Sequence, residues 1–156
     1  MDRNENLSEH FTLGELMRSE IAERTGIDNN PPQDLIPKLK RICDKVLEPI
    51  RKYYGRPFRP NSGYRSPELN KKIGGSKKSQ HCLAEAVDIE IPGVSNYDLS
   101  VWIRDNLEFD QVILECYRPG EPNSGWVHVS LKDSEDTNRS VALTYSNQKY
   151  SEGLIA

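Results

Sequence analysis

Apolar residues recur at spacings of three and four between Gln33 and Tyr54, and this is the clearest periodic signal in the chain. Such spacings place side chains on one face of a helix, so they predict a long helix with one buried stripe. The stripe consists of Leu35, Ile36, Leu39, Ile42, Cys43, Val46, Ile50 and Tyr53. Pro49 should bend this helix, because proline lacks an N–H donor and its ring clashes with the preceding turn. Gly55 and Pro57 should end it.

Shorter helices are expected on both sides of the long one. Thr12 precedes Glu15 by three residues, which is the spacing of a capping box. The pattern that follows predicts a helix from about Leu13 to Glu23. Residues 67–73 could form another short helix, and residues 96–106 should form a third.

The second half of the chain contains segments in which apolar and polar residues alternate, as in strands with one buried face. The clearest is AVDIEI (86–91), whose valine and isoleucines would point to the core. DQVILECY (110–117) and GWVHVSL (125–131) alternate in the same way and are joined by a loop rich in Pro, Gly and Asn. FRPNSGYRS (58–66) should be a strand that runs into a turn.

Helices that come first and strands that come later, with short links between strands, predict an α+β domain. Its N-terminal helices should cover one face of a mainly antiparallel sheet, and the opposite face should carry a cleft. The length of 156 residues fits a single domain with a core from about residue 7 to residue 132. From Asp133 onward the chain is polar apart from a short apolar run at residues 141–145, and it should form a C-terminal tail.

The composition narrows the possible classes of function. Hydrophobic residues make up 35% of the chain, and no apolar run approaches the roughly 20 residues that cross a bilayer, so no membrane span is expected. The formal net charge of -3 argues against a nucleic-acid binder. A local basic cluster near Arg65 would be either a solvated loop or a rim that attracts an anionic substrate. Its members are Lys71, Lys72, Lys77 and Lys78.

The N-terminal stretch and the cysteines bear on where the protein is made. MDRNENLSEH has no apolar h-region, so we expect synthesis in the cytoplasm without a signal peptide. The three cysteines are odd in number and irregular in spacing, which does not suit a disulfide framework. Cys43, Cys82 and Cys116 should each be a buried small hydrophobe. We expect the domain to be a monomer.

The alternation turns one ionisable residue of each predicted strand away from the core. These residues are Asp88, Glu115 and His128, and they would gather on one sheet face if the three strands are neighbours. His81, in the loop that enters the Asp88 strand, can reach the same place. Two imidazoles and a carboxylate suit catalytic zinc, which takes three protein ligands and leaves a fourth position for water. A nearby carboxylate can then act as the base that takes a proton from that water.

Three motifs resemble those of one family. SQHCLAEAVD (79–88) resembles the S-x-H-x-x-G-x-A-x-D motif of the zinc D-Ala-D-Ala carboxypeptidase and endolysin family, which has the hedgehog-type metallopeptidase fold. SGYRS (62–66) and WVHV (126–129) look like its other two signatures and occur in the same order. LSEHFTLGEL (7–16) and VLEPIR (46–51) look like its phage-encoded, single-domain branch. The resemblance therefore covers nearly the whole chain.

The resemblance implies a role for each matched position, with Zn²⁺ as the cofactor. The metal ligands that it implies are His81, Asp88 and His128. Arg65 matches an arginine that holds a substrate carboxylate or the developing oxyanion, and its planar guanidinium can pair with two oxygens at once. Ser79 and Gln80 are further candidates for substrate contact.

Other interpretations of nearby residues stay open. Trp126 and Tyr64 could stack on a ring of the substrate, or could simply be partly buried beside the site. Cys82 could be a thiolate ligand for zinc, although Asp88 already fills the third place. A nucleophile pair of Cys116 with His128 is also conceivable, but it lacks an obvious orienting partner.

Two positions depart from the family pattern. Ala84 stands where the motif has glycine, which is tolerable unless the backbone there needs a positive φ. Gly125 stands where many relatives carry the acidic base, three residues before the second histidine ligand. Glu115 is the substitute that we favour, and Glu121 in the following loop is held in reserve. Asp110 is a weaker choice, because an aspartate at the start of a strand is usually a turn residue.

These observations predict a zinc-dependent peptidase that cleaves peptidoglycan stem peptides. It would be of the D-Ala-D-Ala carboxypeptidase or the L-Ala-D-Glu endopeptidase type. The preferred setting is a phage protein that degrades the bacterial cell wall, either at lysis or as part of the virion. If no acid lies near the metal, the alternative is a non-catalytic virion or peptidoglycan-binding module of the same fold.

Overall fold

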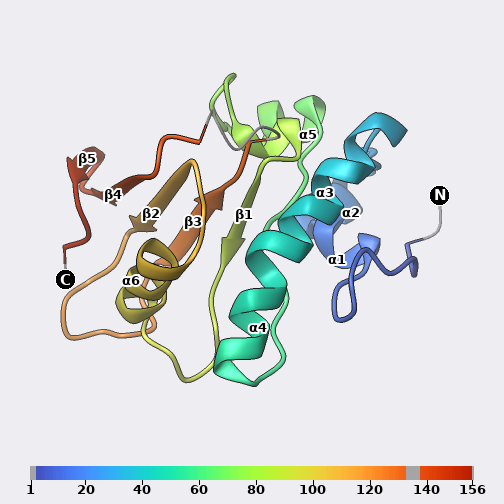
Figure 1. Cartoon of the computed structure of the whole chain (residues 1–156). Coiled ribbons are helices and arrows are strands. Elements are labelled where there is room, and N and C mark those ends of the chain that lie inside the picture. The colour runs from blue at the N-terminus through green and yellow to red at the C-terminus, as the bar shows by residue number, and fades with distance from the viewer. Residues whose placement is uncertain (1–2, 133–137, 156) are drawn as a thin grey trace.

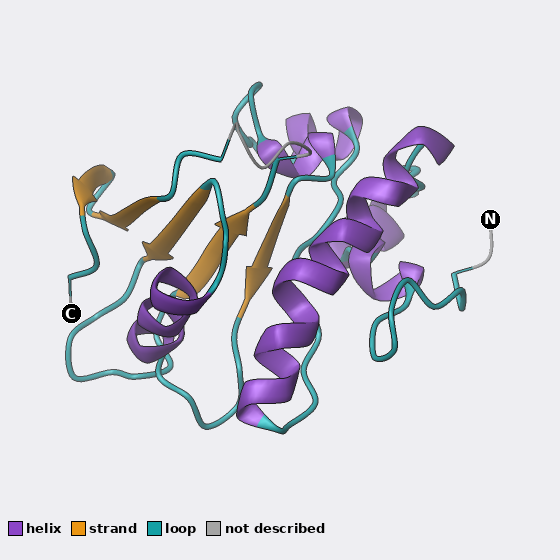
Figure 2. Cartoon of the chain, viewed as in Figure 1, coloured by secondary structure: helices purple, strands orange, loops and turns teal. Residues whose placement is uncertain are grey.

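The computed structural model describes residues 3–132 and 138–155. Residues 133–137, where the predicted polar tail begins, lie outside the described part. Helices and a five-stranded sheet make up a mixed α+β architecture, with α6 on one face of the sheet and the N-terminal helices beside β1 (Figures 1 and 2). The predicted fold class is therefore confirmed. Within the described residues, no helix is long and apolar enough to cross a membrane.

The first helical segment is divided into α1 (Leu13–Met17) and α2 (Glu20–Thr25), so the prediction of one continuous helix is wrong. Ser19 causes the break: its backbone is extended, and its side chain accepts a hydrogen bond from the first turn of α2. The predicted capping box is confirmed at α1. The Thr12 hydroxyl accepts from the Glu15 backbone at 3.3 Å, and the Glu15 carboxylate accepts from the Thr12 backbone at 3.0 Å.

The long helical stretch spans residues 33–54, as the periodicity predicts. It consists of a 3-10 turn (Gln33–Leu35), α3 (Ile36–Ile42), a π-helical turn (Cys43–Leu47) and α4 (Glu48–Tyr54). The wide turn ends two residues before Pro49, and the Glu48 N–H donates to the Cys43 carbonyl five residues back. A π turn of this kind lets a helix continue past a residue that cannot donate to the ladder. Gly55, in a left-handed conformation, ends α4.

The sheet is mainly antiparallel, as predicted. Its strands are β1 (Ala86–Ile89), β2 (Gln111–Glu115), β3 (Trp126–Ser130), β4 (Val141–Ser146) and β5 (Lys149–Glu152). They lie in the order β1-β3-β2-β4-β5, and β2 with β4 is the parallel pair. Because β4 and β5 follow residue 138, the sheet extends beyond the core that the sequence predicts.

The segment 58–66 was predicted to be a strand, and this prediction is wrong. It makes a single bridge, between Ser62 and Asp88, in which the Asp88 N–H donates to the Ser62 carbonyl at 2.8 Å. The contact nevertheless places Ser62 and the following Arg65 beside β1. The helix α5 (Pro67–Lys72) follows, as expected.

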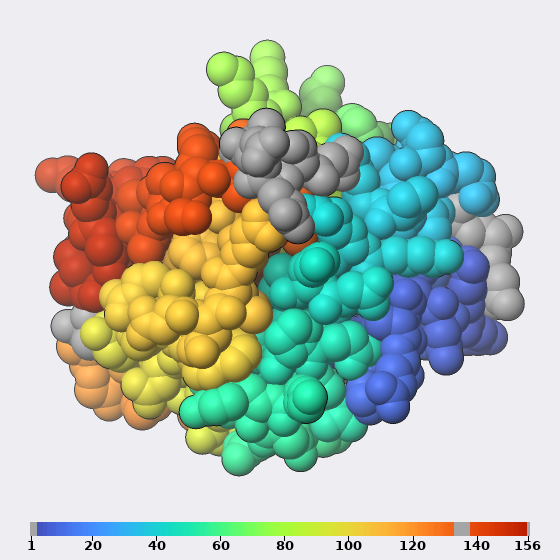
Figure 3. Space-filling view, in the orientation of Figure 1, coloured from blue at the N-terminus to red at the C-terminus, as the bar shows by residue number. Residues whose placement is uncertain are grey.

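The core lies between the helices and one face of the sheet. The strand residues that point into it are Val87, Ile89, Val112, Leu114, Val127 and Val129, each at most 1% exposed. The helix α6 (Asn96–Asn106), which has its predicted bounds, packs over β2 and β3. In the space-filling view, α6 (yellow) and the long helical stretch (cyan to green) lie side by side on the face shown (Figure 3). The alternate strand residues therefore face the other side of the molecule.

Candidate metal centre

Strand pairing places the ionisable residues of β1, β2 and β3 on one sheet face. Asp88 on β1 pairs in register with His128 on β3. Trp126, two residues before His128, pairs with Glu115 on β2. Residues two apart on a strand share a face, so Glu115 lies on the same side as Asp88 and His128.

His81 reaches this face from a 3-10 turn (Gln80–Leu83) that leads into β1. Ser79 caps the turn, because its hydroxyl accepts from the His81 backbone N–H at 3.2 Å. The His81 residue is only 4% exposed. Its Nδ1 lies 2.8 Å from the Gly63 carbonyl oxygen, and its Nε2 lies 3.2 Å from Asp88 Oδ2.

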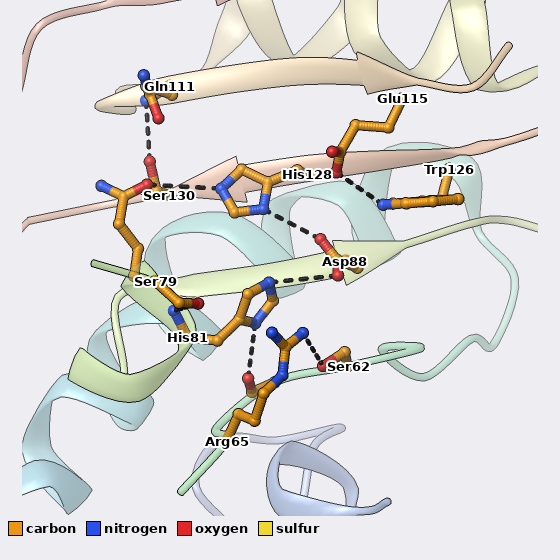
Figure 4. Close-up of polar contacts among 12 residues, drawn as sticks. Ser62, Arg65, Ser79, His81, Asp88, Gln111, Glu115, Trp126, His128 and Ser130 are labelled. Atoms are coloured by element: carbon orange, nitrogen blue, oxygen red, sulfur yellow. Dashed lines mark hydrogen bonds and ion pairs between the residues drawn. The ribbon is translucent and has the colours of Figure 1, made fainter. Parts of the chain in front are cut away.

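Asp88 lies between the two imidazoles (Figure 4). Its Oδ1 is 3.1 Å from His128 Nδ1, while its other oxygen faces His81. Potential ligand atoms of the three residues lie within 4.8 Å of one another, and no other His, Cys, Asp or Glu of the described chain joins the group. Although burial favours the neutral acid, the hydrogen bonds with His128 and His81 hold the pKa of Asp88 well below its usual range.

The surroundings of both imidazoles fit a bound cation. A neutral imidazole has one donor and one acceptor nitrogen. His81 meets the Gly63 carbonyl with one nitrogen and the Asp88 carboxylate with the other. His128 likewise lies between the Gln80 side-chain oxygen, at 3.5 Å, and Asp88. If a neutral imidazole donates its N–H to the carbonyl oxygen, the lone pair of its other nitrogen points at the Asp88 carboxylate. Two electron-rich groups then face each other, so a proton or a metal ion is needed between the nitrogen and the carboxylate. Nitrogen and oxygen donors in this number suit zinc.

Glu115 lies beside this cluster and is partly buried. The Trp126 indole N–H donates to Glu115 Oε2 at 2.8 Å (Figure 4). Burial, reinforced by the nearby Asp88 carboxylate, raises the pKa of Glu115. A carboxylate beside such a cluster can act as an acid and a base, because it can accept a proton and return it.

Gly125, which stands where the resemblance places an acid, leaves no room for a side chain. Its φ of +68° is in the left-handed region, and a Cβ there would lie 2.0 Å from the Glu115 carbonyl oxygen. Any side chain at this position would therefore collide with the end of β2.

The other two acids considered as bases lie elsewhere. Glu121 is exposed in the loop between β2 and β3 and forms an ion pair with Arg118. The Asp110 side chain is fully buried and is held by Arg139. Of the three candidates, Glu115 is the one that lines the cleft around His81, Asp88 and His128.

The cleft is open and has a volume of about 570 Å³. Among the residues that line it are Arg65, Ser79, Gln80, His81, Asp88, Glu115, Trp126 and His128. Arg65 is held by Asn70 Oδ1 at 3.0 Å and by Ser62 Oγ at 3.4 Å. Tyr64 is only 4% exposed and borders a smaller neighbouring hollow, which also includes Arg65. Lys78 is the member of the basic cluster that lines the cleft.

The cleft also contains residues that sequence patterns did not single out. Lys132, Arg139 and Tyr150 line it from the C-terminal part of the chain. The apolar run at 141–145 was the one signal for a strand there, and a lone arginine in a polar segment carries no signal of its own.

The structure also shows the backbone conformation at Ala84 and the burial of the three cysteines. Ala84 has a φ of +58°, so the backbone does need the left-handed conformation that the motif's usual glycine adopts freely.

Cys43 is buried, as expected, whereas Cys82 is partly exposed and Cys116 is exposed. The prediction of burial is therefore wrong for Cys116, which lies beyond the end of β2 with a φ of +57°.

Comparison with known proteins agrees with the geometry. The family model described as Peptidase M15 matches residues 9–130, which is more than half of the chain. The matched range includes His81, Asp88 and His128. No curated protein matches the sequence. The strands β4 and β5 lie outside the matched range. The chain belongs to the peptidase M15 family, which indicates a metallopeptidase.

Proposed function

We propose that this protein is a zinc-dependent peptidase that cleaves peptidoglycan stem peptides. The observation that carries the proposal is the convergence of His81, Asp88 and His128 in an open cleft. The ligand set is that of catalytic rather than structural zinc sites, which are usually closed by four protein ligands. Zinc held there would act as a Lewis acid and lower the pKa of water to about 7.

Glu115 is proposed as the general base and acid. It would take a proton from the attacking water and pass it to the amine that leaves when the peptide bond breaks. Its place in the cleft and the hydrogen bond from Trp126 support this role, because the first puts the carboxylate near the three proposed ligands and the second fixes its orientation.

Arg65 is proposed to bind a carboxylate of the stem peptide or the oxyanion that develops at the cleaved carbonyl. Figure 4 shows it on the other side of the His–Asp–His cluster from Glu115. Asn70 and Ser62 orient the guanidinium, so its remaining N–H groups are available for a substrate oxygen. Ser79, Gln80 and Trp126 line the cleft and are proposed to contact the peptide, with Tyr64 contributing from the adjoining hollow.

The substrate bond is proposed to be either D-Ala-D-Ala or L-Ala-D-Glu. The setting that we propose is a phage protein of the single-domain type, active as a monomer and without nucleic acid. It would be made in the cytoplasm and act at the bacterial cell wall, at lysis or from the virion.

Digestion of purified muropeptides, followed by mass spectrometry, tests the proposal. We expect one of the two bonds to be cut, and we expect the activity to disappear with a chelator and return with Zn²⁺. Zinc-loaded protein that leaves every muropeptide intact would contradict the peptidase and favour a wall-binding module.

A further inference from the structure

Asp110, at the start of β2, is the centre of a buried hydrogen-bond network. Arg139 donates to its Oδ1 from the backbone N–H and from Nε, both at 3.0 Å, and to Oδ2 from Nη2 at 2.8 Å. Gln80 Nε2 donates to the same Oδ2 at 3.0 Å. The Asp110 side chain has no exposed surface. A buried carboxylate with this many donors is a fixed structural element rather than an ordinary turn residue.

Asp110 determines which way the Gln80 amide points. Burial opposes ionisation, but the hydrogen bonds from Arg139 and Gln80 outweigh it and lower the pKa of Asp110 to about 2. An ionised carboxylate can only accept hydrogen bonds, so the NH₂ group of Gln80 must face it. The oxygen of Gln80 then faces His128 Nε2, at 3.5 Å. This distance is long for a hydrogen bond. What matters for His128 is that the atom beside its Nε2 is the Gln80 oxygen, which can only accept a hydrogen bond.

We propose that Arg139, Asp110 and Gln80 are positioning residues that keep the proton of His128 on Nε2 and direct the lone pair of Nδ1 to the metal. An acceptor beside Nε2 favours the proton there, and a neutral ring then has its free electron pair on Nδ1. That nitrogen already faces Asp88 at 3.1 Å. The inference rests on the proposed metal site, but not on the identity of the peptide bond that is cut.

The network ties the C-terminal segment to the metal centre. Arg139 lies beyond residue 130, where the match to the peptidase M15 family ends. It is held in place by strand pairing, since the Val141 N–H donates to the Asp110 carbonyl at 3.0 Å as β4 begins beside β2. The fourth strand would thus support the site without contributing a ligand.

Zinc affinity, measured by competition with a chromogenic chelator, tests the network. Arg139→Ala and Gln80→Leu should each weaken zinc binding by roughly 10–100-fold, the range for residues that orient a metal ligand. Arg139→Lys, which keeps the charge but not the planar fork, should fall between wild type and Arg139→Ala. Arg104→Ala is the control, because Arg104 pairs with Asp105 on the surface of α6. Circular dichroism confirms that each variant is folded.

A spectroscopic measurement separates positioning from general stability. In zinc-loaded protein with ¹⁵N-labelled histidine, long-range ¹H–¹⁵N correlation should show zinc on Nδ1 of His128 and the proton on Nε2. Zinc on Nε2, or affinities of Arg139→Ala and Gln80→Leu equal to wild type, would overturn the inference while leaving the metal site intact. A wild-type chain that binds no zinc would overturn both the metal site and the network.

Discussion

Asp88 on β1 faces His128 on β3 directly across the paired strands, with Asp88 Oδ1 3.1 Å from His128 Nδ1. The second oxygen of the same carboxylate lies 3.2 Å from His81 Nε2. One carboxylate therefore joins two imidazoles that come from different elements, a strand and a 3-10 turn. This arrangement makes Asp88 the residue through which the metal site is most directly tested.

Asp88→Asn should remove most of the zinc affinity, because it replaces a charged ligand with a neutral amide of the same shape. The loss should exceed the roughly 10–100-fold expected for a residue that only orients a ligand. Chelator competition measures it, with Asp98→Asn on the exposed side of α6 as the control. Wild-type binding should also weaken in acid, because imidazole must be unprotonated to hold metal. Full zinc occupancy in Asp88→Asn would exclude the ligand assignment.

Glu115→Gln should bind zinc normally and lose turnover by a factor of roughly 100 or more, as expected for a lost acid–base group. Glutamine keeps an oxygen for the Trp126 indole N–H, so the local packing is retained. Glu121→Gln is the matched control, because Glu121 lies in the exposed loop beside Arg118. If Glu121→Gln rather than Glu115→Gln abolished cleavage, the base would have been assigned to the wrong residue.

In the zinc-free protein, the pKa of Glu115 should lie above the ordinary value of glutamate, about 4.3. Burial and the nearby Asp88 carboxylate both disfavour its ionised form. A bound Zn²⁺ should lower this pKa, because a nearby cation favours the carboxylate. Carboxyl ¹³C chemical shifts, followed against pH with and without Zn²⁺, check both statements, and Glu115→Gln identifies the Glu115 signal. A pKa at or below the ordinary value in the zinc-free protein would contradict the expectation.

Arg65→Ala should lower kcat/KM by roughly 10–100-fold, which corresponds to about 1.5–3 kcal/mol for a hydrogen bond to a charged group. Arg65→Lys should recover part of the loss, since it restores the charge without the two-pronged geometry. Arg59→Ala, at an exposed position on the same segment, serves as the control. Equal losses on peptides with and without a free carboxylate would assign Arg65 to the oxyanion instead.

Asp110 should make the fold sensitive to acid. Its pKa is about 2 in the folded protein and about 3.9 in an unfolded chain. Between these values the unfolded chain binds the proton more tightly, so the free energy of unfolding falls as the pH drops from about 4 to about 2. Thermal unfolding with chelator present should show this fall in wild type and a flatter dependence in Asp110→Asn. An identical pH dependence in both proteins would contradict the assignment.

Gly125→Ala should destabilise the protein more than Gly120→Ala. Both glycines have positive φ, and a non-glycine residue in that region costs about 1–2 kcal/mol. At Gly125 the added Cβ also collides with the Glu115 carbonyl oxygen, whereas at Gly120 it meets no atom within 4 Å. The free energies of unfolding of the two variants, measured in urea, should differ by the cost of this collision. Equal free energies of unfolding would show that the loop moves to relieve it.

Much of this protein follows from local patterns. The capping box at Thr12, the long helical stretch and α6 depend on interactions between residues near in sequence, and their spacings show in the chain itself. Alternation within β1, β2 and β3 places Asp88, Glu115 and His128 on the polar side of their strands, because strand side chains point to alternate faces. The residue types then indicate a metal site.

The tertiary structure decided which of these elements meet. Whether the polar sides form one cleft depends on the strand order β1-β3-β2, which no local pattern specifies. The segment 58–66 makes only one bridge to β1, although its residues suit a strand. The lack of space for a side chain at Gly125 comes from the nearby Glu115 carbonyl oxygen, ten residues earlier in the chain. Arg139 reaches Asp110 through the pairing of β4 with β2. Contacts of this kind join residues far apart in sequence, so they exist only once the chain has folded.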